Sequence, residues 1–323
     1  MIDVPAEFSL PHKISLPFTP PYDVEALLAA QRTHAVAGID APEPSAGSAP
    51  SAGSTPSAGS APSGDTAPNS AAATPDAVIT RSIRHDGRVG LIRATFCESH
   101  VELSSSVPID DHLARRVRRW LDLDAVPRET AQLLGGDPVI GPLVARRPGL
   151  RIFGHIDDVE AACFAVLGQQ VSLASARTFQ RRFVAAFGTL DAATGYRSLH
   201  DAAEIASLDP LEIREAIGLT RSRAATLHAV ATELAAGLTL DDDPDSIRHR
   251  LLGLKGIGPW TADYLAVRAI GDRDAFPTGD LVLRRAMGAD SVRDAMQRGE
   301  AWRPLRAYAT FHLWTEYAYC APR

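Results

Sequence analysis

The spacing of apolar residues along the chain changes near residue 150. Before that point, a helical stretch at 24–30 is followed by two runs typical of strands, at 89–96 and 101–107, and by a helical period over 109–123. After residue 157, strand signals vanish and helical periods recur at 159–167, 173–187, 211–217, 224–235, 247–252, 259–270, 281–287 and 304–319. The pattern predicts an α+β domain over residues 1–150 and an all-helical domain over residues 151–323.

One segment of the first half has no such pattern. Residues 41–76 are almost entirely Ala, Gly, Ser, Thr and Pro, with a near-repeat of Pro-Ser-Ala-Gly-Ser. This composition cannot bury enough apolar surface to offset the entropy of an ordered chain. The sequence therefore predicts a disordered loop at 41–76 that interrupts the first domain.

Composition and charge limit the function. A chain of 323 residues with 45% hydrophobic content can bury two ordinary cores. Its net charge of −6 argues against a protein that holds nucleic acid through overall basicity. Any DNA binding must therefore come from a local face or from backbone amides.

The cysteines and the N-terminus bear on cofactors and location. Cys97, Cys163 and Cys320 lie too far apart for the usual zinc or iron–sulfur spacings, so we expect no iron–sulfur cluster. Residues 1–10 lack a basic region followed by an apolar run, and no stretch approaches the roughly 18 apolar residues of a membrane span. We expect a soluble cytoplasmic protein without a membrane partner.

A glycine turn lies between two helical periods at 251–270. Gly256 and Gly258 flank Ile257, and Pro259 suits the first position of the following helix. Glycines leave room for another backbone to approach, and the N–H groups at a helix start attract phosphate. The segment predicts a helix-hairpin-helix that binds a phosphate backbone, although a tight helix connection alone would also explain the glycines.

The same segment continues to Thr278-Gly279-Asp280, where Asp280 lies 22 positions after Gly258. This chain resembles the helix-hairpin-helix (HhH-GPD) superfamily of DNA glycosylases, within it the bacterial DNA-3-methyladenine glycosylase II group. Further similar segments are Pro20–Asp23, Pro148–Arg151, Leu167–Ser172 and Trp302–Tyr308, so the resemblance covers nearly the whole chain. It implies that the first domain is a TATA-box-protein-like half-sheet.

The resemblance assigns the catalytic role to Asp280. A carboxylate near C1′ stabilises the positive charge that builds on the sugar as a purine departs. Judged without the resemblance, an acid at a helix start is more typical of an N-terminal cap, and both roles can coexist. Relatives that also cut the strand carry a lysine where this chain has Trp260. The resemblance therefore implies a monofunctional enzyme that needs no cofactor.

Other site residues follow from the same resemblance. Trp260 and Tyr264, four apart on one helix, and Trp314 would form an aromatic pocket for a cationic methylated base, although core packing is the ordinary role of such residues. Where the family has a pocket phenylalanine in the first domain, this chain has Ala30. Gln170 occupies the position of the wedge that fills the gap left by a flipped nucleotide, where the compared family member has leucine.

Backbone contacts complete the predicted DNA site. The resemblance assigns phosphate binding to the N–H groups of Gly256, Gly258 and Thr261, whereas Lys255 either contacts phosphate or is merely solvated. It also implies a structural monovalent cation held by the carbonyl groups of three hairpin residues. These residues are Leu252, Leu254 and Ile257.

The sequence thus predicts a monomeric base-excision enzyme whose partner is damaged double-stranded DNA. It would flip alkylated purines, of the 3-methyladenine and 7-methylguanine types, and hydrolyse the N-glycosidic bond with Asp280. One alternative is a glycosylase for deaminated or oxidised bases. Another is a non-catalytic hairpin protein that binds damaged DNA.

Overall fold

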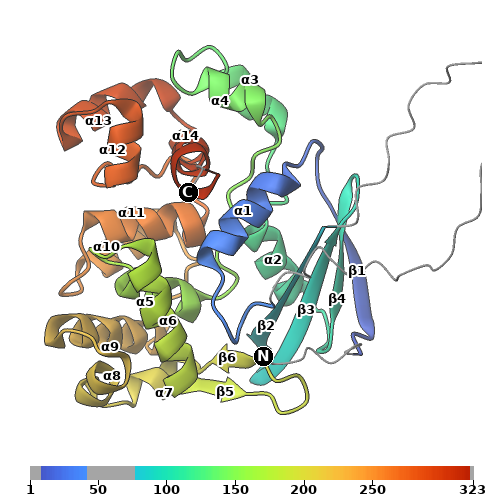
Figure 1. Cartoon of the computed structure of the whole chain (residues 1–323), viewed down its shortest axis with the longest axis vertical. Coiled ribbons are helices and arrows are strands. Elements are labelled where there is room, and N and C mark those ends of the chain that lie inside the picture. The colour runs from blue at the N-terminus through green and yellow to red at the C-terminus, as the bar shows by residue number, and fades with distance from the viewer. Residues whose placement is uncertain (1–8, 42–76, 321–323) are drawn as a thin grey trace, which may run out of the picture.

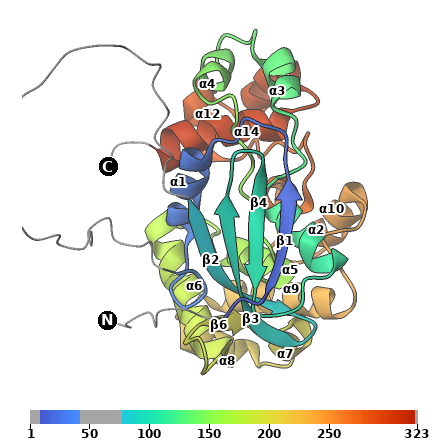
Figure 2. The same ribbon diagram turned by 90° about the vertical axis from the view of Figure 1, so that its right-hand side faces the viewer.

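The computed structural model describes residues 9–41 and 77–320. Its first half contains a four-stranded antiparallel sheet in the order β1-β4-β3-β2, formed by β1 (His12–Pro17), β2 (Val78–His85), β3 (Arg88–Phe96) and β4 (His100–Ser105). Figure 2 looks onto this sheet, with the helices behind it. Buried positions alternate with less buried ones along parts of β3 and β4, because successive side chains of a strand point to opposite faces. One face of the sheet therefore packs against those helices.

The described residues of the first half also contain four helices. They are α1 (Val24–His34), α2 (Asp111–Trp120), α3 (Pro127–Leu134) and α4 (Gly141–Arg146). Figure 1 shows α1 and α2 between the sheet and the helical half, and α3 and α4 beside the C-terminal helices. One hydrophobic core joins residues of the sheet and of α2, such as Leu103 and Trp120, to C-terminal residues such as Trp302 and Phe311.

The second half is built from short helices around a core of its own. They are α5 (Asp158–Leu167), α6 (Leu173–Phe187), α7 (Ala202–Ala206), α8 (Pro210–Ile217), α9 (Arg221–Ala235), α10 (Pro244–Leu252), α11 (Pro259–Leu265), η1 (Ala266–Ile270), α12 (Leu281–Met287), α13 (Val292–Gly299), η2 (Glu300–Trp302), α14 (Arg306–Trp314) and η3 (Thr315–Tyr319). Helix α5, which is buried from Glu160 to Leu167, packs mainly on α9. None of the helices in the described ranges is both long and apolar enough to cross a membrane.

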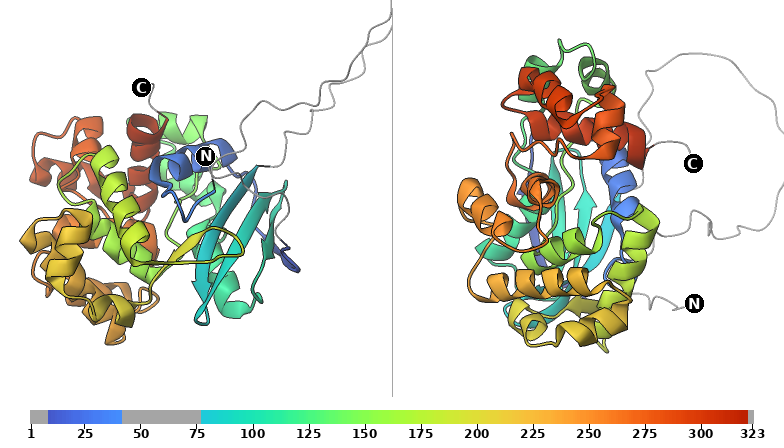
Figure 3. Two further views of the ribbon diagram at one scale, coloured as in Figure 1. Left: turned by 60° about the horizontal axis from the view of Figure 1, so that its bottom comes forward. Right: turned by 90° about the vertical axis from the view of Figure 1, so that its left-hand side faces the viewer.

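A two-stranded hairpin links the two halves. Strands β5 (Gly188–Leu190) and β6 (Arg197–Leu199) pair with each other, and the hairpin extends toward the sheet (Figure 3, left). Arg84 of β2 donates from Nε to the carbonyl oxygen of Leu199 at 3.1 Å. The hairpin therefore fastens the helical half to the edge strand β2.

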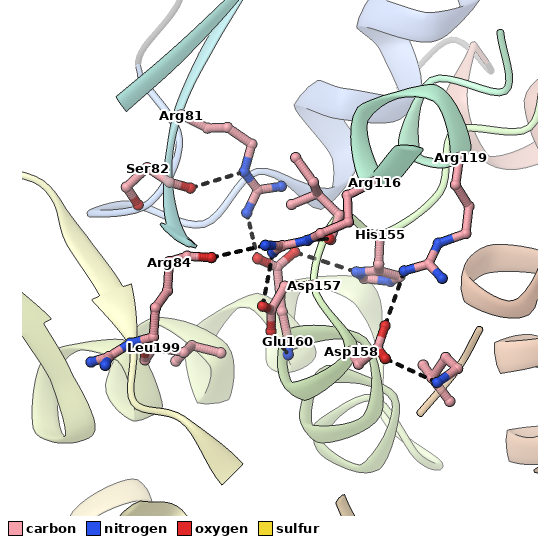
Figure 4. Close-up of polar contacts among 12 residues, drawn as sticks. Arg81, Ser82, Arg84, Arg116, Arg119, His155, Asp157, Asp158, Glu160 and Leu199 are labelled. Carbon is pink, nitrogen blue, oxygen red and sulfur yellow. Dashed lines mark hydrogen bonds and ion pairs between the residues drawn. The ribbon is translucent and has the colours of Figure 1, made fainter. Parts of the chain in front are cut away.

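Arginines of the first half also hold the start of α5. Arg116 donates to Asp157 at 3.1 Å, Arg119 donates to Asp158 at 3.0 Å, and Arg81 forms a buried ion pair with Glu160 (Figure 4). Burial acts to raise the pKa of Glu160, but the Arg81 guanidinium and the bond from His155 outweigh it and bring the pKa to about 2. The charged network thus fixes the helix that carries the turn at 168–171.

The observed elements confirm the α+β fold class and most of the predicted helices. Two features differ from the expectations. The second half is helical but also contains the β5–β6 hairpin, and the elements that were not predicted include β2, α3, α4, α7 and α13. The predicted disordered loop at 41–76 lies, except for residue 41, outside the described residues.

Candidate nucleic-acid interface and base pocket

The hairpin between α10 and α11 owes its shape to Gly256. This residue has φ +95°, and a Cβ added there would lie 2.0 Å from Oγ1 of Thr226, a buried residue of α9. Gly258, the residue before α11, has φ −101°, and an added Cβ would meet nothing within 4 Å. Internal packing therefore requires glycine at 256, whereas only an external partner could require it at 258.

Polar contacts tie this hairpin to the turn after α5. Gln169 donates from Nε2 to the Gly256 carbonyl oxygen and to Oγ1 of Thr261, both at 3.0 Å. The Thr261 N–H already donates to the Gly258 carbonyl oxygen at 3.0 Å. Among the described residues, the N–H groups of Gly256 and Gly258 have no acceptor, and the Lys255 side chain is exposed. Of the three amides expected to bind phosphate, two are thus available.

Gln170 projects from the turn that Gln169 anchors. It is exposed, has φ +52°, and lines a groove of about 1110 Å³ together with the hairpin. Arg223 of α9 donates to the Gln169 carbonyl oxygen at 2.7 Å, which holds the backbone next to Gln170. The predicted wedge therefore lies on the same groove as the predicted phosphate-binding turn.

Asp280 lies where this groove meets a deeper cavity. It is the N-terminal cap of α12, and its Oδ1 accepts from the Leu283 N–H at 2.8 Å. Oδ1 also accepts from Trp314 Nε1 at 3.2 Å, and Oδ2 accepts from Trp260 Nε1 at 3.0 Å. A carboxylate has about four acceptor positions, so the contacts of the described residues leave one position on Oδ2.

The predicted aromatic residues meet beside Asp280. Trp260 and Tyr264 stack at 5.5 Å with an interplanar angle of 24°, and Tyr264 lies 6.0 Å from Trp314. All three rings line a cavity of about 350 Å³, as does Asp280. The cavity and the groove share residues, among them Trp260 and Asp280, so the cavity opens onto the hairpin surface.

The contribution of the first half to the cavity differs from the expectation. Ala30 is fully buried in the first core and is not among the cavity-lining residues. Thr33 and His34, at the end of the same helix α1, line the cavity instead. Ala30 therefore does not line the cavity, and Thr33 and His34 are the residues by which α1 shapes it.

Three further residues form a polar group at this wall. His34 Nε2 lies 3.0 Å from Arg268 Nη1 and 3.3 Å from the Tyr319 hydroxyl, and Tyr319 also lines the cavity. Burial and the neighbouring Arg268 guanidinium hold the pKa of His34 well below its usual value. These residues could not be recognised in the sequence, because α1, η1 and η3 are far apart in the chain and no local pattern marks them.

The residues proposed for a monovalent cation lie at the end of α10 and in the hairpin. The Leu254 carbonyl oxygen accepts from the Ile257 N–H at 3.1 Å, which uses one of its two lone pairs. The carbonyl groups of Leu252, Leu254 and Ile257 supply only neutral oxygens, which suit a monovalent ion of low charge density. The cation stays a prediction.

Comparison with known proteins agrees with this arrangement. Residues 13–157 match the family model of the AlkA N-terminal domain, and residues 163–303 match that of the HhH-GPD superfamily base excision DNA repair protein. A probable bifunctional transcriptional activator/DNA repair enzyme AlkA of Mycobacterium tuberculosis is 37% identical over 263 residues, or 74% of this chain. The chain spans only about half (50%) of that relative's length.

Two further proteins are similar over most of their length. DNA-3-methyladenine glycosylase 2 of Escherichia coli is 30% identical over 220 residues, covering 67% of this chain and 76% of that protein. A solved structure of the 3-methyladenine DNA-glycosylase from Archaeoglobus fulgidus superposes with a TM-score of 0.65 at 22% identity, covering 74% of this chain and 87% of the other. The chain belongs to the HhH-GPD superfamily of base excision DNA repair proteins and carries an AlkA-type N-terminal domain.

Proposed function

We propose that this protein is a monofunctional DNA glycosylase that releases alkylated purines from double-stranded DNA. The observation that carries the proposal is the position of Asp280, held by two indole N–H groups where an aromatic cavity opens onto the hairpin groove. A nucleotide flipped from the groove would place its base in the cavity and its sugar at the carboxylate. The family supports DNA as the partner.

The chemistry follows from the charge of the transition state. As the N-glycosidic bond breaks, the sugar becomes an oxocarbenium-like cation, which a fixed carboxylate stabilises more than it stabilises the neutral sugar. The remaining acceptor position on Oδ2 can hold the attacking water or face C1′. The bonding electrons leave with the base, water adds to C1′ and loses a proton to Oδ2 or to solvent, and the products are the free base and an abasic site.

The aromatic rings and the hairpin supply binding. Trp260, Tyr264 and Trp314 offer π-faces to a methylated purine, and stacking on such faces contributes about 1–3 kcal/mol per base. The Gly256 and Gly258 amides and Lys255 would hold phosphates, and Gln170 would fill the gap in the base stack. Strand cleavage is not expected, because the position of the lyase lysine in relatives is occupied by Trp260.

The test compares the parent protein with Asp280→Asn on methylated duplex DNA. Asparagine also caps helices well, so α12 should persist. Asp243→Asn is the matched control, because Asp243 caps α10 by accepting from the Ser246 N–H at 2.9 Å, away from the cavity. Released bases are measured by chromatography, and abasic sites are revealed by alkali.

We expect the parent and Asp243→Asn to release methylated purines, and Asp280→Asn to lose at least about 100-fold in rate while still binding the DNA. Activity of Asp280→Asn within tenfold of the parent would contradict the catalytic role. Strand cleavage before alkali would contradict a monofunctional enzyme. DNA binding without base release by the parent would favour a non-catalytic damage-binding protein.

A further inference from the structure

A polar group lies on the cavity wall contributed by α1 and η3. His34 and Tyr319 line the cavity together with the aromatic rings and Asp280. Behind them lies Arg268 of η1, which is only 1% exposed. Its Nη1 reaches His34 Nε2 at 3.0 Å.

Arg268 is held rigidly by its surroundings. Its guanidinium lies 5.8 Å from the ring of Tyr264, 5.7 Å from that of Phe153 and 5.9 Å from that of Phe311. Contact of a cation with aromatic faces is favourable, so these rings fix the guanidinium against His34. The charge also lies beside Tyr264, which weakens the attraction of that ring for a second cation in the cavity.

The contact with Arg268 decides where the proton of His34 lies. A guanidinium can only donate hydrogen bonds, so Nε2 of His34 must be the acceptor and carry no proton. The Tyr319 hydroxyl, 3.3 Å from the same nitrogen, is a weaker contact, because this nitrogen has only one lone pair. The imidazole is therefore the neutral Nδ1–H tautomer, as expected from the lowered pKa of this histidine.

The Nδ1–H group faces no acceptor in the described part of the protein. No hydrogen bond to another described residue reaches this atom, and it is not one of the buried polar atoms without a partner. It is therefore accessible, on a side chain that lines the cavity. A fixed donor in a base pocket favours a base edge that presents an acceptor.

We propose that His34 is a specificity-determining residue: its Nδ1–H donates to the oxygen at C6 of a flipped 6-oxopurine, so the cavity favours 6-oxopurines over purines without this oxygen. The inference rests on the proposed glycosylase function, whose substrate class it narrows. Arg268 is a positioning residue for this contact, because it fixes the tautomer of His34.

The test uses two duplexes that differ only at one base, hypoxanthine or unsubstituted purine, each opposite the same base. Single-turnover release rates are measured for the parent, His34→Phe, His34→Gln and Tyr319→Phe, and their hypoxanthine-to-purine ratios are compared. His34→Phe keeps the ring but removes the donor. His34→Gln can accept from Arg268 through Oε1 and donate through Nε2. Tyr319→Phe leaves the Arg268 contact intact.

We expect His34→Phe to lower the ratio roughly three- to tenfold, the effect of one hydrogen bond to a neutral group. His34→Gln and Tyr319→Phe should keep most of the parent's ratio. An unchanged ratio in His34→Phe would overturn the proposal, as would an equal loss in Tyr319→Phe. If the parent releases bases from neither methylated DNA nor these duplexes, the glycosylase function itself fails.

A second measurement does not depend on the folding of His34→Phe. Nitrogen NMR of the ¹⁵N-histidine-labelled parent distinguishes a protonated from a bare ring nitrogen, and the His34 signals are assigned as those missing from His34→Gln. We expect a protonated Nδ1 and a bare Nε2. A protonated Nε2 would overturn the proposal whatever the release rates show.

Discussion

The hairpin offers a sharp test of the structure, the substitution Gly256→Ala. The added Cβ would lie 2.0 Å from Oγ1 of Thr226 and 3.0 Å from its Cβ and Cγ2, and the backbone would keep a φ of +95°. Thr226 cannot turn away freely, because Oγ1 lies 3.0 and 3.1 Å from the carbonyl oxygens of Ser222 and Lys255, which share its single donor proton. The side chain is also 5% exposed and packed within the protein.

Two costs add at this position. An L-residue held in the left-handed region costs about 1–2 kcal/mol. Overpacking against Thr226 costs about 1–3 kcal/mol more. We therefore expect Gly256→Ala to lower the free energy of unfolding by about 2–5 kcal/mol, measured by urea denaturation with circular dichroism and tryptophan fluorescence.

Gly258→Ala is the matched control two residues away. Its added Cβ meets nothing within 4 Å and its φ is −101°, so the free energy of unfolding should change by no more than about 0.5 kcal/mol. If the hairpin binds phosphate as proposed, this variant should nevertheless bind duplex DNA more weakly. A stable protein with impaired binding would separate the internal role of Gly256 from the external role of Gly258.

A double-mutant cycle identifies the source of the cost. Thr226→Ala removes Oγ1 and Cγ2, two of the three atoms nearest to the added Cβ. On its own this substitution should lower the free energy of unfolding by about 1 kcal/mol, because a hydrogen bond is lost. Combined with Gly256→Ala, it should restore about 1–2 kcal/mol of the stability that the clash removes. Three results would refute the reasoning: Gly256→Ala as stable as the parent, Gly258→Ala as unstable as Gly256→Ala, or no coupling with Thr226→Ala.

Two other predictions concern Asp122 and Lys255. Burial raises the pKa of Asp122 to about 6, above its value of about 4 in the unfolded chain. The stabilising contribution of this carboxyl is therefore complete below about pH 4 and is lost as the pH rises to about 6, which lowers the free energy of unfolding by up to about 3 kcal/mol. Asp122→Asn should remove that decrease when urea unfolding is compared at pH 4, 5, 6 and 7; an unchanged decrease in the variant would assign it to another group. Lys255→Ala, in the exposed hairpin turn, should lower the slope of log affinity against log salt by about one, and an unchanged slope would show that Lys255 does not contact phosphate.

Elements with local signals could be predicted from the sequence. The helices at 173–187 and 281–287 were found with their observed bounds, because their starts carry capping residues and their apolar residues follow one helical period. Strand β2 (Val78–His85) was missed because its buried positions include Arg81, whose charge is neutralised by Glu160 and Asp40, which lie far away in the sequence. An arginine that looks solvated in the sequence can be internal when its partners lie far away in the chain.

The candidate site also contains some residues that the sequence indicated and others that it did not. Asp280, Trp260 and Tyr264 lie within 21 consecutive residues, so one motif indicated them together. His34 and Tyr319 could not be recognised, because each is unremarkable until η1 and η3 bring a buried guanidinium and a hydroxyl to the end of α1. The resemblance pointed to Ala30 on the correct helix, but the residues on the cavity are one turn further along.

The two readings of Asp280 that the sequence left open are compatible in the structure. As a cap, Asp280 accepts from Leu283 through Oδ1, which fixes the carboxylate at the start of α12. The same oxygen accepts from Trp314, and only Oδ2, which accepts from Trp260, keeps a free acceptor position. A carboxylate with three fixed donors needs little reorganisation when a cation forms beside it, which is the condition for electrostatic stabilisation of a transition state. The capping role would therefore prepare Asp280 for the proposed catalysis, and the indoles that line the cavity also orient the group that would act on the sugar.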